Sequence, residues 1–162
     1  ILALLRFVQL TARPQAEVLG EVEGLRGLHS VARHAKVRTD PGLLLFRFSA
    51  PLVFFNAPHF KQQAQAAMDA AGPELKWFVI DALPLTQVDV TGLFELEELA
   101  RTLSARGAEL MLAGRMTEIE EWRKTKGLDE NRVVPRHFPT LKQALRAYRA
   151  MRAAEKANAD TI

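Results

Sequence analysis

The residues with the clearest capacity for chemistry form a short turn of Asp89, Val90, Thr91 and Gly92, which follows an apolar segment ending at Asp81. An Asp-x-Thr-Gly turn that leads into a helix brings a hydroxyl group close to several unpaired backbone N–H groups. Such a place can bind a phosphate group or offer the threonine for phosphorylation. The same residue types also suit a plain helix N-cap, made by Asp89 or Thr91. Taken alone, the turn favours the plain cap.

Other patterns typical of enzymes and metal sites are missing from the sequence. The absence of cysteine excludes disulfides, a thiolate nucleophile and cysteine metal sites. No Gly-x-Ser-x-Gly elbow is present, and Asp81 with Asp89 fits a strand end and a helix cap better than an acid–base pair. The histidines lie far apart in the sequence, without the spacing that puts two metal ligands on one helical face: His29, His34, His59 and His137. We therefore expect no catalytic residue, no enzyme activity, no metal and no cofactor.

The composition is that of one globular domain, because 162 residues with 48% hydrophobic side chains can form a sizeable core. The net charge of +3 is too small to indicate binding of nucleic acid, and we expect none. A basic stretch without interleaved aromatic residues contains Arg26, His29, Arg33, His34, Lys36 and Arg38. This stretch favours a solvated surface over a patch for headgroups or other anions.

The first ten residues are mostly apolar and are interrupted by Arg6. They are too few to cross a bilayer, which needs about 20. An apolar run followed by Arg6 and Arg13 fits the cytoplasmic end of a membrane helix whose remainder is missing. The alternative is an amphipathic helix that packs on its own domain. We expect residues 1–13 to be this helix end or a linker, 14–150 to form one domain, and 151–162 to be a flexible tail.

The body of the chain alternates between apolar runs and amphipathic segments. Glycines interrupt residues 17–40, which predicts one short strand and a long connection. Two strands are expected at residues 43–48 and 52–55, and Asn56 is expected to cap the helix that follows. Further elements are expected as strands at 77–80, 110–113 and 133–134, and as helices after Gly92, from a capping box at Thr117 to Gly127, and from Thr140.

Apolar strands that alternate with helices predict an α/β fold with a mixed or mostly parallel sheet under helices. Right-handed crossovers then place the Asp89 turn at the carboxyl end of its strand. Open α/β sheets tend to carry their functional loops at this end. The predicted topology therefore favours a functional role for the turn.

The sequence Asp89-Val90-Thr91-Gly92-Leu93, after an apolar strand ending in Asp81, resembles the STAS domain, named from sulfate transporters and anti-sigma factor antagonists. The flanking segments 14–20, 42–56 and 107–114 are similar to the sulfate permease (SulP) branch. The resemblance covers about residues 14–148. It implies an α/β, STAS-like domain in which helices pack mainly on one face of a mixed sheet.

The resemblance also implies a function. The chain would be the regulatory domain of a secondary anion transporter of sulfate, bicarbonate or dicarboxylate type, at the cytoplasmic face of the inner membrane and part of an integral membrane protein. It would modulate transport, assembly or partner binding, and would transport nothing by itself. The implied partner is the membrane domain of the same transporter, with a homodimer and a cytoplasmic regulatory protein left open. The alternative is a free-standing regulator, like an anti-sigma factor antagonist, switched by phosphorylation at Thr91.

Six residues form the candidate site. In the antagonist branch the motif reads Asp-Ser-Ser-Gly and its second serine accepts phosphate. Thr91 occupies that position here, but Val90 replaces the first serine, so the switch does not carry over directly. The regulatory turn consists of Asp89, Thr91 and Gly92, and the expected partner contacts are Phe94, Glu95 and Glu98.

Two properties of this site stay open. Phe94 lies off the apolar stripe of its helix, so it is either the margin of the core or an exposed contact. Weak nucleotide binding at the N–H groups of the turn is also open, although Asp89 would repel a phosphate placed there.

Overall fold

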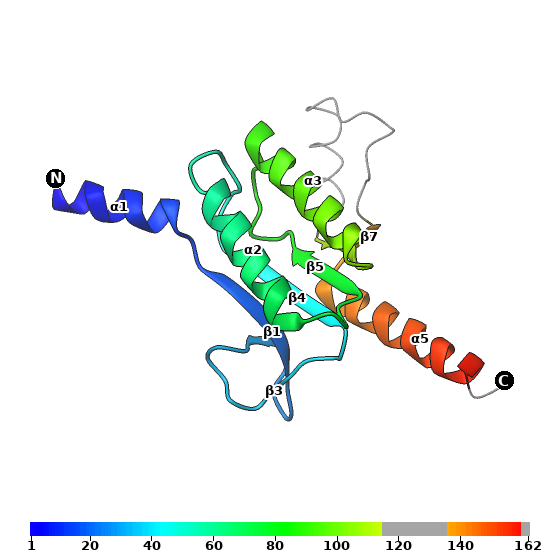
Figure 1. Ribbon diagram of the computed structural model, residues 1–162. Coiled ribbons are helices and arrows are strands. Elements are labelled where there is room, and N and C mark those ends of the chain that lie inside the picture. Colours follow the sequence, from blue (N-terminus) through cyan, green and yellow to red (C-terminus); the bar gives the residue numbers. More distant parts are fainter. Residues whose placement is uncertain (115–135, 160–162) are drawn as a thin grey trace.

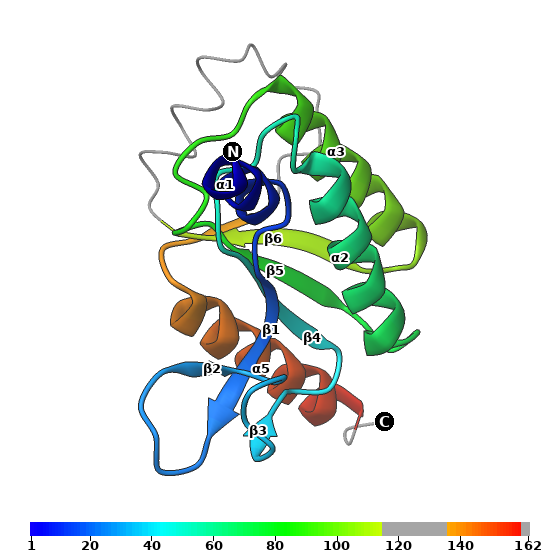
Figure 2. The ribbon, with the colours of Figure 1, turned by 90° about the vertical axis from the view of Figure 1, so that its left-hand side faces the viewer.

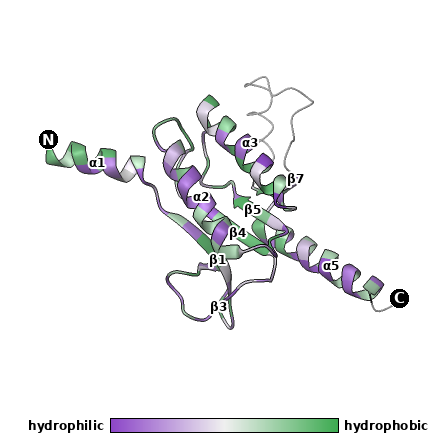
Figure 3. Cartoon of the chain, in the orientation of Figure 1, coloured by the Kyte–Doolittle hydropathy of each residue, from purple (hydrophilic) through white to green (hydrophobic). Residues whose placement is uncertain are grey.

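The N-terminal helix α1 (Leu2–Ala12) projects away from the rest of the chain in the computed structural model, which describes residues 1–114 and 136–159 (Figure 1). Its apolar side chains are largely exposed, among them Leu2, Leu5 and Phe7, and Figure 3 colours much of the helix as hydrophobic. The alternative in which this segment packs its apolar face on its own domain therefore does not describe the structure. Within the described ranges, no helix combines the length and the hydropathy that crossing a bilayer requires.

A seven-stranded mixed sheet forms the centre of the molecule, with the order β2-β1-β4-β5-β6-β7 and with β3 paired to β1. β4, β5, β6 and β7 run parallel, whereas β1 is antiparallel to its neighbours. The strands are β1 (Ala16–Val22), β2 (Leu28–Ser30), β3 (Val37–Arg38), β4 (Leu43–Phe48), β5 (Trp77–Asp81), β6 (Glu109–Ala113) and β7 (Arg136–Phe138). The predicted α/β class and mixed sheet are confirmed.

Helices cover both faces of the sheet. α2 (Ala57–Ala71) and α3 (Val90–Ala105) lie on one face, and α5 (Leu141–Ala159) lies on the other (Figure 2). Alternate residues of β4 supply the two cores: Phe46 packs under α2 and α3, and Leu45 packs under α5. Two of the three helices described in the body thus share one face, as the resemblance implied.

α5 is held against the sheet by a buried tyrosine. The hydroxyl of Tyr148 donates a hydrogen bond of 2.6 Å to the carbonyl of Pro41, and its ring lies edge-on to Trp77. Gly42 has a φ of +80°, and a Cβ at this position would collide with the Tyr148 hydroxyl. The helix continues to Ala159, so residues 151–159, expected as a tail, are helical.

The prediction for residues 17–40 was wrong, because this region forms β1, β2 and β3 in place of one short strand. Gly20 is part of β1 and does not interrupt a strand. A Cβ at Gly20 would collide with the backbone carbonyl of Arg38, so the glycine allows β3 to approach β1 closely.

The predicted strand at residues 52–55 was also wrong. Only Leu52 makes a β-bridge, to Val88, and residues 54–56 form a turn. The apolar run serves as a loop that buries Leu52 and exposes Phe54. The helix expected from Thr117 to Gly127 and the strand expected at 133–134 lie outside the described residues.

Candidate functional site

The Asp89 turn caps α3 and at the same time binds a second loop. Oδ1 of Asp89 accepts a hydrogen bond of 2.8 Å from the backbone N–H of Gly92, which confirms Asp89 as the N-cap. Oδ2 accepts a hydrogen bond of 2.7 Å from the backbone N–H of Phe54, in the loop between β4 and α2. Each carboxylate oxygen thus satisfies one backbone donor.

Two further backbone hydrogen bonds join the β4–α2 loop to the β5–α3 loop. Leu52 N–H donates to the carbonyl of Gln87 at 2.9 Å, and Asp89 N–H donates to the carbonyl of Leu52 at 3.1 Å. The two loops follow adjacent parallel strands, so both leave the sheet at its carboxyl edge. The candidate site is therefore made by two loops of this edge and the first turn of α3.

Gly92 makes the close contact between these loops sterically possible. A Cβ at Gly92 would lie 2.5 Å from the carbonyl oxygen of Leu52 and 3.0 Å from Cγ1 of Val88. The glycine of the motif is thus explained by packing, since any side chain would push α3 away from the β4–α2 loop.

Asn56 begins α2 without capping it, which corrects the expectation of a side-chain cap. Its side chain is buried and turns back into the loop. Oδ1 accepts a hydrogen bond of 3.0 Å from Val53 N–H, and Nδ2 donates to the carbonyls of Pro51 at 2.9 Å and Thr11 at 3.5 Å. The last contact ties the loop to the end of α1.

Apolar side chains at this edge are exposed. Phe94 is 54% exposed and Val90 is 53% exposed on the first turns of α3, and Phe54 is 67% exposed on the neighbouring loop. Phe54 and Phe55 lie edge-on, with ring centroids 5.4 Å apart. Of the two alternatives for Phe94, the structure shows exposure.

The acidic residues of the predicted contact both interact with Lys61 of α2. Glu98 forms an ion pair of 2.7 Å with Lys61 of α2, and Glu95 is half-buried near the same lysine. The hydrogen bond between Lys61 and Glu98 raises the pKa of Lys61 and lowers the pKa of Glu98. Glu98 lies one helical turn after the exposed Phe94, but its carboxylate already has an intramolecular partner.

Thr91 is exposed at the second position of α3, and none of the hydrogen bonds among the described residues involves its hydroxyl. A kinase or a phosphate donor therefore has access to this oxygen. The carboxylate of Asp89 has already engaged the Gly92 N–H, and its negative charge lies at the helix N-terminus. This negative charge would repel a nucleotide phosphate placed at the start of α3.

The structure also contains a partly buried ion pair near this edge that was not predicted from the sequence. Nε of Arg47 in β4 lies 2.7 Å from Oδ2 of Asp81 at the end of β5, and Oδ1 of Asp81 accepts a hydrogen bond from Leu83 N–H. The side chain of Asp81 is only 2% exposed. The register of the parallel strands pairs these two residues directly, so a correct strand alignment is the signal that could have found them.

Within residues 1–114 and 136–159 no group of three or more metal-ligating side chains comes together. The rings of His29 and His34 nevertheless pack edge-on, with centroids 5.2 Å apart. His59 and His137 hydrogen bond to backbone carbonyls, as expected for satisfied structural histidines.

Comparison with known proteins supports the resemblance to the STAS domain along most of the chain. A model of the STAS domain family matches residues 34–144. A probable sulfate transporter of Mycobacterium tuberculosis is 31% identical over 148 residues, which cover 91% of this chain and 26% of that protein. The chain thus spans about a quarter of the length of this relative.

Two solved structures share the fold. The murine solute carrier 26 family member A9 anion transporter, in its inward-facing state, aligns with a TM-score of 0.79 at 19% identity, over 91% of this chain and 24% of that one. A putative anti-sigma factor antagonist of Thermotoga maritima aligns with a TM-score of 0.55 at 15% identity, over 69% of this chain and 92% of that one. At such identities the likeness concerns the fold alone.

Proposed function

The chain belongs to the STAS domain family, and from this premise we propose that it is the cytoplasmic regulatory domain of a membrane anion transporter. The transported anion is of sulfate, bicarbonate or dicarboxylate type, and the domain modulates transport or assembly by contacting the membrane domain of the same protein. The name of the mycobacterial relative and its greater length support this proposal.

The observation that carries the proposal is the exposed apolar surface next to α1. Phe54, Phe55, Val90 and Phe94, here termed the apolar edge, are exposed where the Asp89 turn joins the two loops. The loop with Phe54 and Phe55 also contacts the end of α1 through Asn56 and Thr11. Exposed apolar side chains gathered in one place are typical of an interaction surface.

In this proposal the polar residues of the turn position the apolar ones. Asp89 holds the loop of Phe54 against α3, and Gly92 lets the two approach. Phe54 and Phe94 supply the contact, because large apolar side chains contribute most of the energy of protein interfaces. Glu95 and Glu98 contribute charge at the margin, with Glu98 held by Lys61.

Cysteine cross-linking tests the proposed contact directly, because the chain has no cysteine of its own. In an intact transporter without other cysteines, Phe54→Cys and Phe94→Cys are expected to cross-link to cysteines introduced on the cytoplasmic surface of the membrane domain. Val31→Cys is the matched control, since Val31 is also an exposed apolar residue. Equal cross-linking from all three positions would rule out a specific apolar edge.

Transport measurements test whether the proposed contact regulates anion transport. Phe94→Ala and Glu98→Lys are expected to change the rate of anion uptake in proteoliposomes of the intact protein, or its assembly. Val31→Ala should leave both unchanged. If Phe94→Ala and Glu98→Lys also leave transport, assembly and partner capture unchanged, the regulatory role is wrong.

The exposed hydroxyl of Thr91 favours a second candidate, a free-standing regulator that is switched by phosphorylation. Phosphate on Thr91 would add about two negative charges at the start of α3, next to the apolar edge. Mass spectrometry of the native protein that repeatedly finds Thr91 unmodified would eliminate the switch. About ten or more long apolar helices encoded ahead of Ile1 would favour the transporter over the free-standing regulator.

A further inference from the structure

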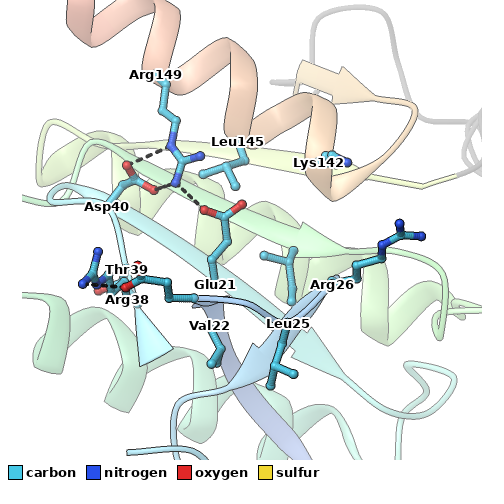
Figure 4. Close-up of a pocket in the computed structure, with 13 residues that line it drawn as sticks. Glu21, Val22, Leu25, Arg26, Arg38, Thr39, Asp40, Lys142, Leu145 and Arg149 are labelled. Atoms are coloured by element: carbon cyan, nitrogen blue, oxygen red, sulfur yellow. Dashed lines mark hydrogen bonds and ion pairs between the residues drawn. The ribbon is translucent and has the colours of Figure 1, made fainter. Parts of the chain in front are cut away.

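A pocket lies on the α5 face, between the β1–β2 hairpin, residues 38–40 and α5 (Figure 4). Its volume is about 850 Å³, enough for a small organic molecule. Figure 2 places β2 and β3 at the end of the molecule opposite α1. The pocket is therefore separate from the apolar edge.

Most charged groups of this pocket already have partners. Arg149 lies between Asp40 and Glu21, with N–O distances of 2.9 Å and 2.7 Å, as the dashed lines in Figure 4 show. Hydrogen bonds from these two carboxylates raise the pKa of Arg149 above its usual range. Arg38 pairs with Glu23 at 3.1 Å. These contacts hold the three carboxylates of this end of the pocket in ion pairs within the chain.

Two cations of the pocket lack such a partner. The side chains of Arg26 and Lys142 line the pocket, are exposed, and take part in none of the ion pairs or hydrogen bonds of the described residues. Lys142 lies in the first turn of α5, which contains no acidic residue. A cation at a helix N-terminus opposes the helix dipole, so an anion bound there would relieve an unfavourable interaction.

The pocket also has an apolar part. Leu28 and Leu145 line it together with Leu25, which is 54% exposed. A ligand that covers these side chains would remove apolar surface from water, which is favourable. The lining therefore suits a molecule that has both an anionic group and an apolar body.

We propose that this pocket binds a soluble organic phosphate, with the phosphate between Arg26 and Lys142 and the apolar body against Leu25, Leu28 and Leu145. A guanidinium group binds phosphate oxygens through two parallel hydrogen bonds, and an ammonium group adds a compact charge. The choice of a soluble ligand over a lipid headgroup rests on the proposed function, in which α1 leads to the membrane, because the pocket lies at the end of the domain distant from α1.

Titration of the 162-residue chain with phenyl phosphate, followed by amide chemical shifts in NMR, tests this site. Saturable shifts are expected at residues 25–28 and 142–145, and inorganic phosphate should bind more weakly because it lacks the apolar body. Arg26→Gln and Lys142→Gln should each weaken binding about fivefold, the loss expected for one exposed charge pair. Lys156→Gln, on the exposed end of α5, is the matched control and should bind like the native chain.

Three outcomes would overturn the proposal. Shifts that do not saturate would show that no site exists. An equal loss of affinity in Lys156→Gln and Arg26→Gln would show that the phosphate is attracted by positive charge in general and has no specific site. Equal affinity for phenyl phosphate and inorganic phosphate would show that the apolar side chains of the pocket do not contribute to binding. Arg26 and Lys142 are exposed, so both variants should retain the native thermal unfolding midpoint, which a parallel melt verifies.

Discussion

The carboxylate of Asp89 accepts a hydrogen bond of 2.7 Å from the backbone N–H of Phe54, a residue 35 positions earlier in the sequence. The other oxygen of the same carboxylate caps α3. One side chain therefore sets both the start of a helix and the position of an aromatic loop.

Asp89→Ala is expected to lower the free energy of unfolding by about 2 kcal/mol, because it removes an N-cap and a second charge-assisted hydrogen bond. Asp89→Asn retains one acceptor oxygen and should lose less. Urea denaturation followed by circular dichroism measures both values. An Asp89→Asn variant as stable as the native chain would contradict a role for the second oxygen.

Gly92→Ala should destabilise the protein although alanine is the better helix former by about 1 kcal/mol. The added Cβ would lie 2.5 Å from the carbonyl oxygen of Leu52, and relieving such overpacking costs about 1–3 kcal/mol. Thr91→Ala, at the exposed neighbouring position, is the control and should change stability by less than about 0.5 kcal/mol. A Gly92→Ala variant as stable as the native chain would disprove the close approach of the loops.

Arg47→Met should destabilise the protein by about 3 kcal/mol, because it leaves the buried carboxylate of Asp81 without its cation. The value is at the low end of the range for buried pairs since the Arg47 side chain is 34% exposed. The double variant with Asp81→Asn should recover part of this loss. A double-mutant cycle measures the coupling, and strictly additive effects would show that the pair contributes nothing.

Burial raises the pKa of the Tyr148 hydroxyl. The folded chain therefore keeps this proton at a pH where the unfolded chain has lost it. The stability that depends on the neutral hydroxyl is complete below the unfolded pKa of about 10 and decreases as the pH rises through the folded pKa. Urea denaturation between pH 8 and pH 11 should show this decrease in the native chain, and Tyr148→Phe should show a smaller one.

The sequence was sufficient to predict features that depend on local patterns. Asp89 was predicted as an N-cap from its place before an amphipathic segment, and the strand ending at Asp81 from its apolar run. The hydrogen bond from Phe54 to Asp89 and the ion pair from Arg47 to Asp81 join residues more than 30 positions apart. Such contacts depend on strand register, which a single sequence does not contain.

Predictions from the sequence failed where one residue type can serve two structural roles. Gly20 suggested an interruption, yet in the structure it allows close pairing of β1 with β3. The apolar residues from Leu52 to Phe55 suggested a strand, because a buried anchor and exposed aromatic side chains look alike in sequence. Glu98 suggested a free surface charge, and only the packing of α2 on α3 reveals its ion pair with Lys61.

The hydrogen bonds around the β4–α2 loop form an unbroken mechanical connection between α1 and α3. It runs from the carbonyl of Thr11 through the side chain of Asn56 to Val53, and from the adjoining Phe54 through Asp89 to Gly92. A rotation or pull on α1 is therefore expected to reach the first turn of α3 without passing through the sheet.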